Sequence, residues 1–159
     1  AAPMTTGYRL PTEAEWEYCA RLTPSGVKLK YPWGAKFPPS PKSGNFADTS
    51  AKSLLTNTIE GYTDGFPVAA APGKFSANPL GFFDMGGNVS EWCNDYYDIY
   101  SYDAEKVAAD PTGPKDGSLR VVRGSSWRHA TATELRLSFR DYGNDPRSDV
   151  GFRVARNAD

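Results

Sequence analysis

The stretch "RVVRGSSWRHATATELRLSFRDY" (120–142) contains two strand patterns. "LRVVRG" (119–124) is typical of a short strand. "LRLSFRDY" (135–142) alternates apolar and polar residues with the period of two expected of a half-buried strand. Between the two lie a Gly-Ser turn, a tryptophan and the only histidine of the chain. "GFRVAR" (151–156) repeats the alternation, with its two apolar residues opposite its central arginine, so the C-terminal third is predicted to be β.

The clearest helix pattern is "LPTEAEWEYCAR" (10–21). Thr12 can cap this helix and Glu15 can return a hydrogen bond, which is the Thr-x-x-Glu capping box. One face of the helix is predicted to point inward. That face carries Trp16, Cys19 and Ala20.

The chain from 23 to 79 is too rich in proline and glycine for ordinary helices or central strands. It is predicted to form long ordered loops with one short helix at 51–55. "DAEKVAAD" (103–110) is predicted to form another short helix.

The chain has 159 residues, a length that fits one domain with a substantial core. Its net charge is -1. The charge does not indicate a nucleic-acid or anionic-membrane partner, and no apolar run is long enough for a membrane span. Cys19 and Cys93 cannot form a disulfide framework or a thiol metal site. We interpret both as small buried residues, and a single bridge between them stays open.

Five segments, in this order, closely resemble the formylglycine-generating enzyme family, also called the sulfatase-modifying-factor domain. They are "YRLPTEAEWEYCAR", "YPWG", "NPLGFFDMGGNVSEW", "RVVRGSSW" and "VGFRVAR". The resemblance implies one α+β domain over residues 1–159, with a C-type-lectin-like fold, little regular secondary structure and long ordered loops. Family domains usually carry a further stretch before the first segment. We therefore expect the N-terminal part of the domain to be missing here, or supplied by another chain or domain.

In the enzymes of this family, two cysteines after the "GGSW" motif bind copper and activate oxygen, which oxidises a substrate cysteine to formylglycine. The resemblance places His129 and Glu134 at these two positions. Neither is a thiolate, the ligand type that selects Cu(I). We therefore expect no copper, no catalytic residues of that oxidase and no formylglycine-generating activity.

The resemblance also implies one or two structural calcium ions. Calcium binds six to eight oxygens, which carboxylates and backbone carbonyls can supply. The spacing of the residues alone favours the other interpretation, in which these acids cap turns. The first site would use the carboxylates of Asp48 and Asp64 and the carbonyls of Thr49 and Phe66. The second would use the carboxylates of Asp84 and Glu91 and the carbonyls of Gly87 and Val89.

Eight arginines and no lysine lie between Arg120 and Arg156. Three interpretations compete: structural ion pairs, an anion- or peptide-binding groove, and a catalytic cluster. The structural partners would be Glu134, Asp141, Asp145 and Asp149. A Ser-His-Asp arrangement would have to combine His129 with Ser125 or Ser126, but no nucleophile elbow surrounds these serines.

Our first hypothesis for function is a calcium-stabilised binding or accessory domain whose ligand is a peptide, a protein partner or a small anion. Its cleft would be formed by Trp127, Arg128, His129, Glu134, Arg136 and Arg140. The second is an enzyme of the same family with different oxidative or maturation chemistry, although iron sites of that kind need more than one histidine. A third is a hypervariable ligand-binding protein. Because free calcium is higher outside the cytoplasm, a periplasmic or extracellular location is expected.

Overall fold

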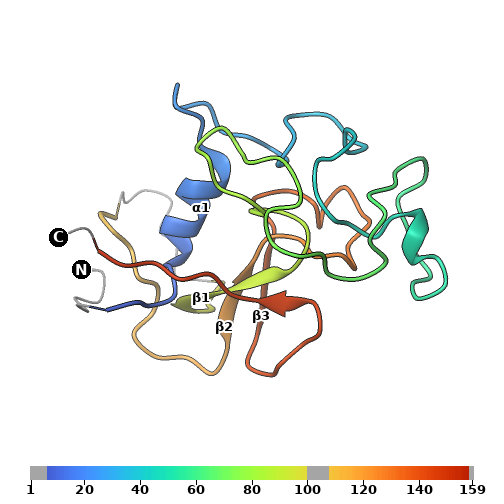
Figure 1. The fold of residues 1–159 in the computed structure, drawn as a ribbon. Helices are drawn as coiled ribbons and strands as arrows, with labels where there is room; N and C mark the ends of the chain where they lie inside the picture. Colours follow the sequence, from blue (N-terminus) through green and yellow to red (C-terminus); the bar gives the residue numbers. More distant parts are fainter. Residues whose placement is uncertain (1–6, 100–107, 158–159) are drawn as a thin grey trace.

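The computed structural model describes residues 7–99 and 108–157 (Figure 1). Long loops make up most of the described chain, which confirms the predicted α+β fold with little regular secondary structure. The elements, in chain order, are α1 (Glu13–Arg21), the 3-10 helix η1 (Thr49–Ala51), β1 (Ser90–Tyr96), β2 (Arg120–Arg123), β3 (Arg140–Gly143) and β4 (Val150–Gly151).

Helix α1 forms as predicted, three residues shorter at its start than the sequence pattern. The Thr12 hydroxyl accepts from the N–H of Glu15, and the Glu15 carboxylate accepts from the N–H of Thr12, so the capping box is complete. Trp16 and Ala20 are buried and Cys19 is half-buried, which confirms the inward face.

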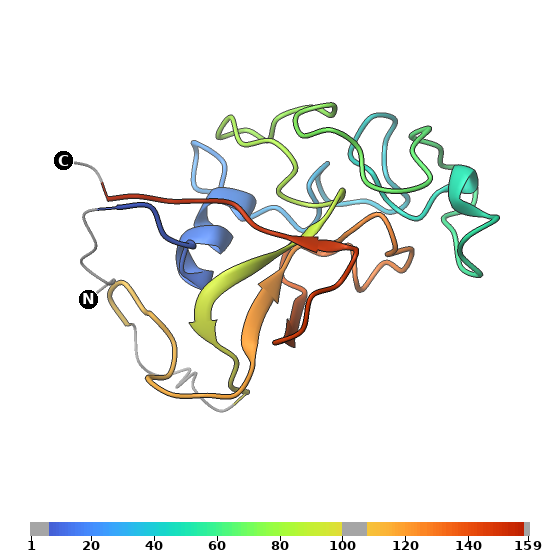
Figure 2. The ribbon, with the colours of Figure 1, turned by 60° about the horizontal axis from the view of Figure 1, so that its bottom comes forward.

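The four strands form one sheet in the order β3-β2-β1-β4 (Figure 2). β2 pairs antiparallel with both β1 and β3, whereas β4 runs parallel to β1. Strand β1 was not predicted, because apolar and polar side chains do not alternate along it as in a half-buried strand. Its buried residues include Glu91, Cys93 and Asp95, and the two acids are held by hydrogen bonds from α1.

The prediction of a strand over 135–142 is wrong for most of its length, since β3 begins only at Arg140. Leu135 and Leu137 are buried as the alternation indicated, but turns produce this burial. The N–H of Leu135 donates to the carbonyl of Thr131, and the N–H of Leu137 donates to the carbonyl of Lys30. The backbone bonds of this segment therefore go to its own turn and to an early loop.

The predicted strand over 151–156 is also shorter than expected, because β4 ends at Gly151. Phe152 and Val154 are exposed, whereas Arg153 turns inward to the Glu91 carboxylate. A partly buried ion pair, rather than apolar burial, therefore decides which side of this segment faces the protein.

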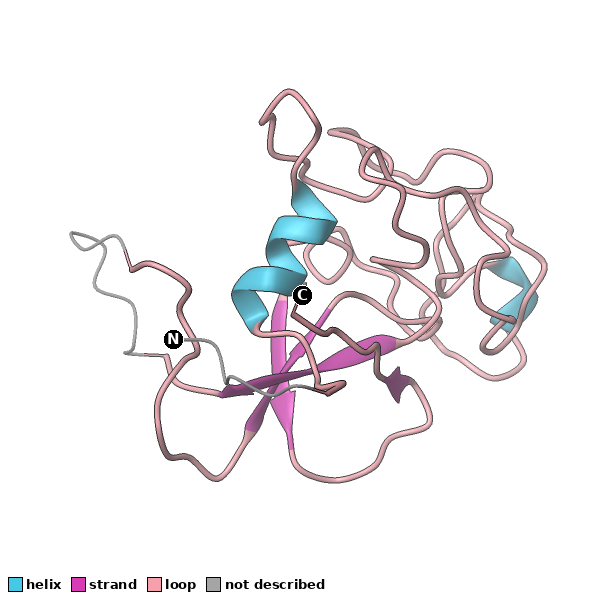
Figure 3. Ribbon diagram, turned by 60° about the vertical axis from the view of Figure 1, so that its left-hand side comes forward, coloured by secondary structure: helices cyan, strands magenta, loops and turns pink. Residues whose placement is uncertain are grey.

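The long loops over 23–79 are confirmed, with the short helix η1 slightly earlier than expected. Figure 3 shows that much of the loop chain gathers beside the helix and strands. Two apolar clusters hold the molecule together. The loop cluster contains Tyr31, Phe46, Ala47, Ile59, Tyr62, Ala130 and Leu135. The helix–sheet cluster contains Trp16, Ala20, Met85, Cys93, Val121 and Leu137.

Three further expectations concern local features. Cys19 and Cys93 are both free, so the single bridge between them does not form. In the described part of the chain, no helix is long and apolar enough to cross a membrane. Most of the helix predicted over 103–110 lies outside the described residues.

Candidate functional site

The loop that follows β2 carries all the predicted cleft residues except Arg140, which begins β3. It begins at Gly124, whose φ of 77° is left-handed, and an added Cβ there would lie 3.1 Å from the Trp16 ring. The loop is fixed to the segment just before β1, since the N–H of Trp127 donates to the carbonyl of Asn88 at 2.9 Å. Trp127 is buried, while Arg128 is exposed with its guanidinium 5.5 Å from the Trp127 ring centroid.

The hydrogen bond that His129 accepts determines which of its two ring nitrogens carries the proton. Its Nδ1 accepts from the backbone N–H of Ser126 at 2.9 Å, and its ring packs edge-on against Phe139. Burial lowers the pKa of His129, against the raising effect of the nearby Glu134 carboxylate. The imidazole is therefore neutral at pH 7, and because Nδ1 is an acceptor, the ring proton is on Nε2.

Ser126 does not form a nucleophile–base pair with His129. The Ser126 hydroxyl is fully buried and donates to Asp149 Oδ2 at 3.0 Å, while its oxygen lies 3.4 Å from His129 Nδ1. Since Nδ1 already accepts from a backbone N–H, it is not placed to remove the hydroxyl proton. The side chains Ser126, His129 and Asp149 thus form a structural hydrogen-bond cluster.

Glu134 is bound to its own turn. Its Oε2 accepts from the N–H and the hydroxyl of Thr131 at 3.0 and 2.7 Å. Burial opposes ionisation, but these hydrogen bonds and the proximity of His129 leave the pKa of Glu134 lowered. Glu134 is therefore an anion at pH 7.

The structure brings together part of the predicted cleft. His129 and Glu134 are electrostatic neighbours, and exposed Arg136 follows in the same turn region. Arg140 does not join them, because its guanidinium binds both carboxylate oxygens of Glu13 on α1 at 2.6 and 2.8 Å.

Most of the other C-terminal arginines make structural contacts, as the first of the three interpretations expected. Arg123 is fully buried and bonds to Glu17 at 2.8 Å and to three carbonyls. Arg147 pairs with the predicted partner Asp141 at 2.7 Å. The glutamates of α1 and β1 were missed as partners because they are distant in sequence.

The two acids of the first predicted calcium site, Asp48 and Asp64, are neighbours among the loops. Asp48 is fully buried, and its Oδ2 accepts from the N–H groups of Asp64 and Gly65 at 2.5 and 3.3 Å. Asp64 accepts from the N–H groups of Phe46 and Phe66 at 3.0 and 2.9 Å.

The pKa values of this pair are those of two neighbouring carboxylates that are removed from solvent. Burial, together with the nearby charge of Asp48, raises the pKa of Asp64 to about 6. Burial alone would raise the pKa of Asp48 as well, but its hydrogen bonds leave it lowered. A calcium ion bound by both carboxylates, with the carbonyls of Thr49 and Phe66 nearby in the chain, would offset the repulsion between them.

The two acids of the second predicted site are arranged differently. Arg153 binds both carboxylate oxygens of Glu91 at 2.6 Å, and the Trp16 indole donates to Glu91 Oε2 at 2.7 Å. Asp84 instead accepts from the N–H of Gly73 at 2.7 Å. Because Arg153 already neutralises Glu91, this arrangement does not fit a calcium ion between these acids and the Gly87 and Val89 carbonyls.

Within residues 7–99 and 108–157, no three His, Cys, Asp or Glu side chains are grouped to hold a metal ion. A calcium ion at the Asp48–Asp64 pair would therefore depend on two carboxylates and on carbonyl oxygens. The two thiols lie outside the loop that carries His129 and Glu134, since Cys19 is on α1 and Cys93 is in β1. Burial raises the pKa of both thiols. Neither is close to being a thiolate at pH 7.

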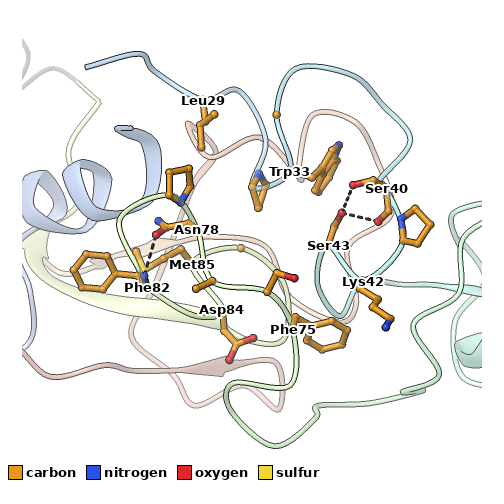
Figure 4. Close-up of a pocket in the computed structure, with 17 residues that line it drawn as sticks. Leu29, Trp33, Ser40, Lys42, Ser43, Phe75, Asn78, Phe82, Asp84 and Met85 are labelled. Atoms are coloured by element: carbon orange, nitrogen blue, oxygen red, sulfur yellow. Dashed lines mark hydrogen bonds between the residues drawn. The ribbon is translucent and has the colours of Figure 1, made fainter. Parts of the chain in front are cut away.

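A pocket of about 310 Å³ lies apart from the predicted cleft, among the loops (Figure 4). The rings of Trp33, Phe75 and Phe82 line it, together with the charged side chains of Lys42 and Asp84. The sequence did not reveal this pocket because its walls come from three separate proline- and glycine-rich segments. Only the density of aromatic residues in these segments could have indicated it.

The comparisons with known proteins agree with this architecture. The chain matches the sulfatase-modifying factor enzyme 1-like domain over residues 1–158. The chain belongs to this family. It is 36% identical over 164 residues to the formylglycine-generating enzyme of Streptomyces coelicolor, covering 96% of this chain and 48% of that enzyme. It is also 38% identical over 157 residues to serine/threonine-protein kinase pkn1 of Chlamydia caviae, covering 94% of this chain and 21% of the kinase.

The solved structure of Treponema denticola variable protein 1 shares the fold, with a TM-score of 0.64 and 33% identity over 94% of this chain and 47% of that one. The chain thus spans about half the length of this protein and of the Streptomyces coelicolor enzyme. Another relative is named inactive C-alpha-formylglycine-generating enzyme 2, from Bos taurus; it is 32% identical over 167 residues, which is 96% of this chain and 45% of that protein. Similarity to these proteins therefore gives the scaffold but does not decide activity.

Proposed function

We propose that this chain is a binding or accessory domain on a formylglycine-generating-enzyme-like scaffold, and that it does not generate formylglycine. The observation that carries the proposal is the state of His129, at the position where the family resemblance puts the first copper cysteine. Its Nδ1 is occupied by the Ser126 N–H, so the ring offers a single Nε2–H donor instead of a soft metal ligand. At the second position, Glu134 is tied to Thr131.

The ligand would carry an anionic group, on a peptide, a protein partner or a small molecule. Arg128 and Arg136 are both exposed in the loop that carries His129, and the Nε2–H of His129 adds a neutral donor. Planar guanidiniums bind carboxylate and phosphate groups with paired hydrogen bonds. Trp127 supports Arg128 through the contact between the guanidinium and the ring.

The absence of oxidase chemistry is tested with a cysteine-containing sulfatase peptide, copper and oxygen. We expect mass spectrometry to find no conversion of the cysteine to formylglycine. The Streptomyces coelicolor enzyme, run in parallel, verifies the assay. Copper-dependent conversion by this chain would overturn the proposal.

Anion binding is tested by calorimetric titration with a tetra-aspartate peptide. Arg128→Ala combined with Arg136→Ala should weaken binding at least tenfold, because both charges contact the ligand directly. The matched control is Lys52→Ala, an exposed cation in another loop, which should bind like the unaltered chain. Equal binding by the double variant and the control would place the ligand elsewhere.

A further inference from the structure

The pocket among the loops has aromatic walls that neighbouring groups hold in place. Trp33 stacks on Tyr31 with ring centroids 4.9 Å apart, and its indole N–H donates to the carbonyl of Lys36 at 2.6 Å. Phe75 is buried and packs edge-on against Phe66, with ring centroids 5.9 Å apart. The pocket volume of about 310 Å³ is at the lower end of the range for small-molecule sites. The walls therefore present an apolar surface of defined shape to a small molecule.

Two side chains of opposite charge, Lys42 and Asp84, line this pocket without neutralising each other. Within residues 7–99 and 108–157, neither of them forms an ion pair. Asp84 Oδ2 accepts from the N–H of Gly73 at 2.7 Å, and Arg153 donates to the backbone carbonyl of Asp84 at 3.4 Å. In the view of Figure 4, the Phe75 ring stands between the Lys42 amine and the Asp84 carboxylate. Both charges are therefore available to a ligand.

Most neutral polar side chains of the pocket are already bonded within the protein. The hydroxyls of Ser40 and Ser43 are 2.8 Å apart, and that of Ser43 also donates to the carbonyl of Ser40. The Asn78 side chain accepts from two N–H groups of its own turn and donates to a carbonyl of α1 at 2.6 Å. Ser76 is the one neutral polar side chain of the pocket that makes no hydrogen bond among the described residues. Recognition of a polar ligand here therefore depends mainly on the two charges.

The backbone at both charged residues is in the left-handed region, with φ of 63° at Lys42 and 54° at Asp84. This conformation is uncommon for residues other than glycine. In the described part of the chain only four such residues adopt it, and two of them carry the charges of this pocket. Left-handed residues other than glycine are enriched at binding sites, where the surrounding fold maintains them. The position of each charge is therefore set by the loops and not by a relaxed local conformation.

We propose that this pocket binds a zwitterionic small molecule with an aromatic body, of the class of aromatic amino acids and their dipeptides. The anionic group of the ligand pairs with Lys42, its cationic group pairs with the second carboxylate oxygen of Asp84, and its ring lies against Trp33 and Phe75. A ligand with a single charge would leave one pocket charge desolvated and unpaired, which weakens binding. The pocket lies apart from the His129 loop, so the proposal does not depend on anion binding there.

The proposal is tested by calorimetric titration of the unaltered chain with free L-phenylalanine and with the dipeptide phenylalanylglycine. The two probes share one ring and two opposite charges, and they differ in the distance between the charges. We expect at least one of them to bind, and the tighter one identifies the charge separation that fits the pocket. Phenethylamine and hydrocinnamate, which each lack one charge, should bind about tenfold more weakly than the zwitterion. L-serine, which lacks the ring, should not bind measurably.

Two variants assign each charge of the ligand to its partner. Lys42→Met removes the cation and should weaken binding of the zwitterion about tenfold, but phenethylamine should bind no more weakly than before. Asp84→Asn should weaken the zwitterion to a similar degree and leave hydrocinnamate unaffected. Asparagine tolerates the left-handed backbone, so this variant keeps the loop conformation. A purely structural role of either residue would instead weaken all probes alike.

The matched controls are Lys52→Met and Asp110→Asn, which change an exposed lysine and an exposed, left-handed aspartate outside this pocket. Both should bind the zwitterion like the unaltered chain, as should the Arg128→Ala, Arg136→Ala variant. Three results would overturn the proposal. The first is no binding of either zwitterion at millimolar concentration. The second is an equal loss for all probes in the two pocket variants. The third is a loss of zwitterion binding in the Arg128→Ala, Arg136→Ala variant, which would place the ligand at the His129 loop.

Discussion

At the scale of single residues, His129 offers the sharpest test because it is the only histidine. Long-range proton–nitrogen correlation spectra of labelled protein should show the proton on Nε2 and a titration midpoint below the usual value near 6.5. Folding disfavours the protonated ring, so the unfolded chain takes up this proton more readily. The stability linked to His129 should therefore be present above about pH 6.5 and be lost as the pH falls.

Two substitutions separate the hydrogen bond of His129 from its titration. His129→Ala leaves the Ser126 N–H without its acceptor and should cost about 1–3 kcal/mol of unfolding free energy. His129→Asn can keep an acceptor near the same point, so it should cost less and also abolish the pH dependence. A proton on Nδ1, or equal losses in both variants, would contradict this assignment.

At the scale of elements, the network between α1 and the sheet should dominate local stability. Glu13 is buried and bonds to Arg140, and its Oε1 lies 3.6 Å from the Nε of fully buried Arg123. Glu13→Gln removes the charge opposite these guanidiniums and should cost about 3–5 kcal/mol in denaturant unfolding. Glu15→Gln, which weakens a more exposed pair with Arg9, is the matched control and should cost about 1 kcal/mol. Equal losses of unfolding free energy in Glu13→Gln and Glu15→Gln would show that the buried network does not dominate local stability.

The elements also show what sequence can predict. α1 was predictable because its cap, its charges and its apolar face are all local to 12–21. β1 was not, because its inward acids are stabilised by partners on α1 and at Arg153 that only the fold brings near. The alternation over 135–139 predicted burial correctly but backbone wrongly, since turns with suitable spacing bury the same side chains.

The sequence could likewise predict some features of the candidate site and not others. The substitution of His129 and Glu134 for thiolates could be read from the sequence, because it depends only on motif positions. The neutrality of His129, the diversion of Arg140 to Glu13 and the pocket near Trp33 could not. The last two arise from contacts between segments that the sequence keeps far apart, and the neutrality of His129 arises from burial, which only the fold produces.

At the scale of the whole molecule, the Asp48–Asp64 pair lies beside the loop cluster, where Asp64 accepts from the N–H of Phe46, and little regular structure supports this region. If calcium binds this pair, it stabilises the folded state by about 2.7 kcal/mol when its concentration is a hundred times the Kd. For a chain of this size, that corresponds to a rise in Tm of roughly 5–10 °C. Removing calcium with EGTA should lower the Tm by that amount in scanning calorimetry.

The choice of variants makes the calcium test specific to one site. Asp48→Asn should remove the difference between calcium and EGTA, because it deletes one of only two carboxylates. Asp64→Asn should also remove it, and in EGTA this variant should be more stable than the unaltered chain near pH 7. The reason is the sign of the shift: a folded pKa of about 6 means that ionised Asp64 destabilises the fold above that pH. Asp84→Asn should leave the calcium response intact, since Glu91 is already neutralised by Arg153. A response that survives Asp48→Asn but disappears in Asp84→Asn would assign the ion to the second site and reverse this conclusion.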